Sequence, residues 1–156
     1  MRKTITAHVA QATPSDSNWL ELERLACVEV SSEEAAYPIE AALAARHGAG
    51  WRAAQAGAQT IRILFDTPQR LSQIWLVFSE AETARTQEFV LRWSPPGGAL
   101  SYELLRQQWT FSPPGTTREI EDYRFELAGV KILDLTIVPD ISGGQARASL
   151  EQMRLA

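Results

Sequence analysis

The chain has 156 residues, a formal net charge of −4 and a hydrophobic fraction of 45%, which suits one domain with a sizeable core. The acidic balance argues against a nucleic-acid partner, because phosphate binding needs a concentrated basic surface. A single cysteine, Cys27, excludes an intrachain disulfide framework. No apolar run reaches the roughly 18–20 residues that span a bilayer, and residues 1–17 contain no apolar signal-peptide core. We therefore expect a cytoplasmic protein without a membrane span.

The first quarter of the chain has few regular patterns. Residues 1–25 are predicted to be an N-terminal arm or an extra strand, and residues 26–30 the first strand of the domain. Cys27 lies in the apolar stretch LACVEV, which favours a small buried side chain. The only plausible helical piece is Ala-rich, and Pro38 limits it to about 39–47.

From residue 59 onward the sequence reads as short β-strands separated by turn signals. The expected strands are 59–65, 71–78, 88–93, 103–111, 123–127, 130–138 and 149–156. The expected connectors are 66–70, 79–86, 94–101, 112–119 and 139–146. The acidic stretch EIEDY (119–123) is interpreted as a solvated turn leading into a strand. This spacing predicts an all-β, antiparallel β-sandwich and not a βαβ fold.

Five tryptophans give the chain aromatic side chains that could pack or bind. Trp51, Trp75 and Trp93 fall in apolar strand patterns and are predicted to be core residues. The turn SPPG begins three residues after Trp109, and the alternation of its strand leaves two interpretations open. Trp109 either packs inward with Leu105 or lies partly exposed at the loop end, as a platform for a sugar ring.

The order of these features resembles a known family. The matching stretches are VEVSSE, EAALAARHGAG, GWRAAQAGAQTIRILFDTPQRLSQIWLVF, EFVLRWSPPGGALSYELLRQQWTF, YRFELAGVKILDLTIVPD and ASLEQMRLA. Together they resemble the galactose-binding-domain-like jelly rolls, also called discoidin or coagulation-factor C-type domains, nearest to bacterial carbohydrate-binding modules. The resemblance covers residues 26–156 and implies a jelly-roll sandwich.

The resemblance implies a binding function, because members of the family mostly bind ligands through loops at one end of the sandwich. We therefore expect a non-catalytic carbohydrate-binding module. A sugar site needs an aromatic face and rigid hydrogen-bond donors. The candidate ligand-binding residues are Trp109, Arg85, His47, Arg106, Tyr37 and Arg52.

The remaining predictions concern an alternative function, enzyme activity and a bound calcium ion. An intracellular protein–protein interaction module with the same fold is the alternative function, so the partner is either a carbohydrate or a protein. Enzyme activity is not expected, because His8 and His47 have no catalytic spacing to a nucleophile or carboxylate. Relatives often carry a structural calcium, but Ala44 and Ala45 replace the common Asp-Gly, and Gln152 replaces a Glu. Since calcium prefers oxygen ligands, calcium is less expected here than in relatives, and we predict no cofactor.

Overall fold

The computed structural model describes residues 18–44, 48–98 and 100–156 and consists mostly of antiparallel β-strands. The elements are α1 (Leu22–Leu25), β1 (Ala26–Val30), α2 (Glu40–Leu43), β2 (Trp51–Ala56), β3 (Gln59–Ser79), β4 (Arg85–Ser94), β5 (Tyr102–Phe111), β6 (Arg118–Val138), β7 (Arg147–Leu150) and β8 (Gln152–Leu155). The antiparallel jelly-roll sandwich expected from the sequence is confirmed.

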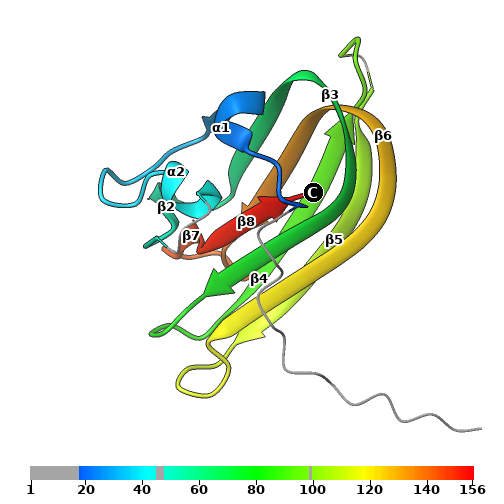
Figure 1. Ribbon diagram of the computed structural model, residues 1–156. Coiled ribbons are helices and arrows are strands. Elements are labelled where there is room, and N and C mark those ends of the chain that lie inside the picture. The colour runs from blue at the N-terminus through cyan, green and yellow to red at the C-terminus, as the bar shows by residue number, and fades with distance from the viewer. Residues whose placement is uncertain (1–17, 45–47, 99) are drawn as a thin grey trace, which may run out of the picture.

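Two long strands connect the layers of the sandwich. Within the described residues the main sheet has the order β1-β3-β6-β4-β5, and β8 also pairs with β3, whereas β2 and β7 form a separate pair. The first half of β3 pairs with β1 and its second half with β8, while β6 follows β3 along both halves. Figure 1 shows β3 and β6 curving together around one end of the molecule.

The continuity of β3 and β6 differs from the sequence prediction. Residues 66–70 were expected to be a connector, but they lie inside β3, where the register with β6 shifts between Leu64 and Gln73. These irregularities accommodate Pro68, which cannot donate to a regular ladder. Likewise 123–127 and 130–138 are parts of the single strand β6, which bends near Gly129 with a φ of +70°.

The core lies between the inner faces of the two layers. Ile61, Ile63 and Phe65 point into it, as their alternation predicts. Phe78 and Phe89, from β3 and β4, stack there with ring centroids 5.2 Å apart. These contacts tie strands that are not neighbours in one ladder into a common core.

The predictions for three tryptophans and for Cys27 can be compared with this core. Trp51 and Trp75 are buried, with 1% and 5% of their surface exposed, whereas Trp93 is partly buried and packs against the core cluster. The indole Nε1 of Trp51 donates to the Ser32 carbonyl at 3.1 Å. The prediction that Cys27 is buried is wrong, because Ala26, Val28 and Val30 face the core and Cys27 takes the opposite, exposed face of β1.

The segments before β1 and around α2 contain the only helices among the described residues, and neither is long and apolar enough to cross a membrane. Of the N-terminal segment 1–25, residues 1–17 lie outside the described residues. Leu22 of α1 is buried in the core, and the Leu20 N–H donates to the Leu155 carbonyl at 2.7 Å. Residues 18–25 therefore pack on the domain. The helix expected at 39–47 corresponds to α2, and residues 45–47 are outside the described residues.

The acidic stretch 119–123 is not a solvated turn. It lies in β6, and strand alternation turns Glu119 inward, where none of its surface is exposed. Its Oε1 accepts a hydrogen bond from Gln87 Nε2 at 3.2 Å. Burial, together with the neighbouring Glu121, raises the pKa of Glu119 to about 9. The periodicity of a strand therefore outweighs the polarity of these residues.

Gly50 gives a direct test of how β2 is seated against β7. Its φ is +80°, and an added Cβ would lie 2.7 Å from the Leu150 carbonyl oxygen. Gly57 has a φ of +86°, but a Cβ there would meet nothing within 4 Å. We expect Gly57→Ala to cost about 1–2 kcal/mol through backbone strain alone. Gly50→Ala is expected to carry the same strain and to lower the free energy of unfolding by ~1–3 kcal/mol more than Gly57→Ala, because its Cβ overpacks the site.

Urea denaturation of the two glycine variants measures this difference. Equal midpoints for Gly50→Ala and Gly57→Ala would contradict the close approach of residue 50 to β7.

Candidate ligand-binding cleft

A cleft opens at the end of the sandwich where β1 ends and β3 meets β4. Its volume is about 870 Å³, and a smaller hollow of about 110 Å³ adjoins it and shares Tyr37, Arg52, Ser79 and Ser149. The lining consists of Glu34 and Tyr37, Arg52 of β2, residues 79–83, Asp140, residues 143–147 and Ser149. We call this the loop-end cleft. It is formed by segments that are far apart in the sequence.

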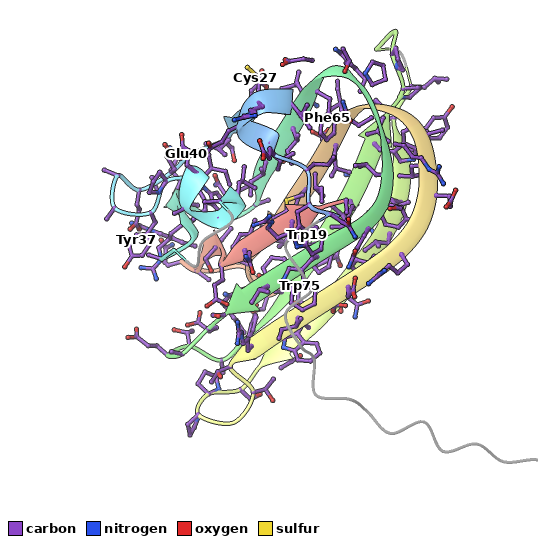
Figure 2. The ribbon with its side chains drawn as sticks, in the orientation of Figure 1. Trp19, Cys27, Tyr37, Glu40, Phe65 and Trp75 are labelled. Atoms are coloured by element: carbon purple, nitrogen blue, oxygen red, sulfur yellow. The ribbon has the colours of Figure 1, made fainter. Side chains whose placement is uncertain are left out.

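One wall of the loop-end cleft is an aromatic–arginine pair. The Arg52 guanidinium lies over the Tyr37 ring, 4.5 Å from its centroid. Backbone bonds hold the loop in place, since the Arg52 N–H donates to the Tyr37 carbonyl at 3.2 Å and the Glu34 N–H donates to the Arg52 carbonyl at 2.9 Å. Figure 2 shows Tyr37 near α2, at the opposite end of the view from the bend of β3 and β6.

A second arginine spans the same side of the cleft. Arg147 Nη1 donates to Glu34 Oε1 at 2.6 Å, which links β7 to the loop that carries Tyr37. This contact joins residues 113 positions apart. The pair is about half exposed on the arginine side, so the Arg147 guanidinium is available to a ligand.

The opposite wall is held by Arg85, whose side chain is 1% exposed. Its Nε donates to Glu80 Oε1 at 2.7 Å, and its Nη1 donates to the Pro139 carbonyl at 2.7 Å. The guanidinium also lies over the Phe111 ring, 4.8 Å from the centroid. Arg85 therefore clamps together the starts of the two loops that line this wall.

Two carboxylates of this wall, those of Glu80 and Asp140, are held by hydrogen bonds and ionised. Burial would raise the pKa of Glu80, but the hydrogen bonds from Arg85 and from the Glu82 and Thr83 N–H groups lower it below its ordinary value. Hydrogen bonds from the Ser142 hydroxyl and N–H lower the pKa of Asp140. Both side chains therefore present acceptors at neutral pH.

The structure brings two of the six predicted site residues into the cleft. Tyr37 and Arg52 line it, and Arg85 lies directly behind its wall without lining it. His47 lies outside the described residues. The part of these six candidates in ligand binding stays a prediction.

Trp109 and Arg106 lie elsewhere, on β5. Trp109 is partly buried, pairs in register with Gln87 and packs against the core, with its Nε1 buried and unpartnered among the described residues. Arg106 is on the exposed outer face, where its Nη1 lies 2.5 Å from Glu88 and its Nη2 2.8 Å from Glu103. Neither residue lines the loop-end cleft, so the packed alternative for Trp109 is the one observed.

Several cleft residues were not singled out from the sequence, including Glu34, Glu80, Asp140 and Arg147. Glu80 and Asp140 lie in segments that were predicted as connectors, and Arg147 directly follows one. Strand patterning can locate such loops, but it cannot show which of them meet. Among the residues that the structure describes, no three His, Cys, Asp or Glu side chains group to hold a metal ion. The expectation about calcium stays a prediction.

No family model matches the sequence, and no curated protein matches it significantly. Solved structures do share its fold. A family 32 carbohydrate-binding module of C. perfringens NanJ, in complex with galactose, is 12% identical with a TM-score of 0.66, covering 88% of this chain and 96% of that one. An F5/8 type C domain from Bacteroides fragilis is 15% identical with a TM-score of 0.61, covering 89% and 96%.

A third similar structure is part of a protein–protein complex. A chain in the structure of reduced XRCC1 bound to the DNA pol beta catalytic domain is 13% identical with a TM-score of 0.59, covering 85% of this chain and 95% of that one. The chain therefore has the galactose-binding-domain-like, or discoidin-like, jelly-roll fold. At these identities the likeness establishes the fold, and function is argued from the site.

Proposed function

We propose that the protein is a non-catalytic carbohydrate-binding module that holds a sugar in the loop-end cleft. The observation that carries this proposal is the Tyr37–Arg52 pair, which stands in a polar cleft at the loop end of the sandwich. An aromatic ring offers a face to the C–H groups of a sugar. Solved modules of the same fold, one of them holding galactose, support the proposal.

The hydroxyl groups of the sugar are matched by charged side chains. Arginine donates in a fixed planar fork, and Arg52 and Arg147 supply two such groups. Glu80 and Asp140 supply carboxylate oxygens, which accept hydrogen bonds from hydroxyls. Because hydrogen bonds within the protein already orient Glu80, Asp140 and Arg147, the cleft loses little side-chain entropy on binding.

The state of the carboxylates also favours binding over catalysis. A general acid near neutral pH needs a raised pKa, whereas the pKa values of Glu80 and Asp140 are lowered. Glu34 is paired with Arg147. Glycoside hydrolysis needs a protonated carboxyl group opposite a free carboxylate, and the described cleft residues do not supply this pair.

A glycan array followed by titration of the tightest binder tests the proposal. Tyr37→Ala and Arg52→Ala are expected to weaken binding at least ~10-fold, because about 1.4 kcal/mol of lost contact corresponds to a factor of ten. The matched control is Arg106→Ala, which removes an arginine from the outer face of β5 and should bind like the parent. The proposal would be contradicted if Tyr37→Ala binds as tightly as the parent, or if no glycan binds at all.

An intracellular protein–protein interaction module is the second candidate. It is favoured by the same fold in a chain of the complex between XRCC1 and the DNA pol beta catalytic domain. This candidate would replace the first if no glycan on the array binds and if a purified partner protein binds the parent chain but not Tyr37→Ala.

A further inference from the structure

We infer that the loop-end cleft selects uncharged or amine-bearing sugars and discriminates against uronic acids. This inference rests on the proposed function, because it concerns the charge of the sugar that the same cleft would hold. It follows from the balance of charged side chains that line the cleft and from the pairing of each one.

Carboxylates outnumber arginines in the described lining. The cleft and its adjoining hollow are lined by two arginines, Arg52 and Arg147, and by five carboxylates, which are those of Glu34, Glu80, Glu82, Asp140 and Glu151. A cleft lined mostly by one sign of charge concentrates the opposite charge and repels its own. The approach to the cleft therefore favours a cation over an anion.

Ion pairs neutralise some of these carboxylates but not all. Glu34 pairs with Arg147 at 2.6 Å, Glu80 with Arg85 at 2.7 Å and Glu151 with Arg118 at 3.2 Å. Among the residues that the structure describes, Glu82 and Asp140 have no such arginine or lysine partner. They stand on the two loops that Arg85 clamps together.

Asp140 keeps its charge in neutral solution. The Ser142 hydroxyl and N–H donate to its Oδ1 at 2.7 and 3.0 Å, and these bonds lower its pKa. An ammonium group on a sugar would find this fixed acceptor, with Glu82 on the neighbouring loop. A charge-assisted hydrogen bond of this kind is about twice as strong as a neutral one.

Arg52 is the cleft arginine that has no carboxylate partner among the described residues, and its guanidinium is already stacked on Tyr37. A uronate that paired with Arg52 would bring its carboxylate into a cleft whose other unpaired charges, in the described lining, are also carboxylates. The like charges oppose binding, whereas a neutral hexose meets no such opposition.

The experiment compares matched sugars by NMR titration of the folded chain at low salt. The probes are the methyl glycosides of the neutral hexose, the 2-amino sugar and the uronic acid, each in the galacto and the gluco configuration. The amino sugar is expected to bind about tenfold or more tightly than the uronic acid, a difference of about 1.4 kcal/mol. The preference should shrink at 1 M salt, where the Debye length is about 3 Å.

The double variant Glu82→Gln, Asp140→Asn separates charge from shape. It should remove the preference for the amino sugar over the uronic acid, and any loss measured with the neutral hexose gives the part that is due to the hydrogen bonds of these side chains. Its matched control is Glu126→Gln on β6, which removes one charge from an exposed pair with Arg70 of β3. Equal binding of the three charge classes, or tightest binding of the uronic acid, would overturn the inference and leave the proposed function intact. A chain that binds no sugar in any class contradicts the proposed function itself.

Discussion

Arg85→Met is expected to lower the free energy of unfolding by ~3–5 kcal/mol, because it breaks a buried ion pair and leaves its partner uncompensated. The guanidinium is 1% exposed and donates to Glu80 and to the Pro139 carbonyl, each at 2.7 Å. Methionine fills a similar volume but supplies neither bond. Since both contacts hold loops of the cleft, we also expect sugar binding to be lost.

Urea denaturation and glycan titration of the same variants check this prediction. Arg106→Ala is the control for stability, because its two ion pairs lie on the exposed face of β5 and exposed pairs contribute about 0–1 kcal/mol. Arg85→Lys should recover little, since an ammonium cannot reproduce a planar fork. A loss in Arg85→Met no larger than that in Arg106→Ala would contradict the role of Arg85 as a clamp.

Glu119→Gln is expected to flatten the dependence of stability on pH. In the folded chain the pKa of Glu119 is raised to about 9 by burial and by Glu121, whereas an ordinary Glu has a pKa of about 4.3. Between these two values the folded state keeps a proton that the unfolded state releases. The parent protein therefore loses stability as pH rises from about 4.3 to 9.

Denaturation midpoints from pH 5 to pH 9 measure this effect. Glu119→Gln keeps an oxygen for Gln87 but cannot ionise, so its advantage over the parent should grow as pH rises. The control Glu126→Gln removes a carboxylate from an exposed pair and should follow the pH profile of the parent. Parallel profiles for the parent and Glu119→Gln would show that Glu119 does not keep its proton in the folded chain.

Much of the sandwich could be predicted from alternation, because a half-buried strand places every second side chain in the core. The inward set Ile61, Ile63 and Phe65 follows that pattern. Alternation also explains the two errors at Cys27 and Glu119. An apolar neighbourhood suggested burial for Cys27 and a polar one suggested exposure for Glu119, but the face of the strand decided both.

The breaks between strands were harder to predict, because Pro68 and Gly129 carry turn signals and yet lie inside β3 and β6. Both strands bend there without ending, since the irregular register and the glycine conformation absorb the change of direction. The sequence contains the signal for a local irregularity. It does not show whether that irregularity is a bend or a loop.

The cleft could be predicted only as a location at the loop end. Tyr37 and Arg52 were singled out, but it is the backbone pairing between their segments that brings them together. Arg147 and Glu34 meet across 113 positions of sequence. Trp109 attracted attention through its neighbouring turn, although its ring packs against the core.

The central claim, that a sugar binds in the loop-end cleft, is tested most directly by mapping backbone amide shifts in an NMR titration with the tightest glycan from the array. We expect the saturable shifts to cluster at Tyr37, Arg52 and Arg147 and in residues 79–83 and 140–146. Shifts that cluster instead around Trp93 and Tyr102, whose rings pack 5.3 Å apart on β4 and β5, would contradict the claim.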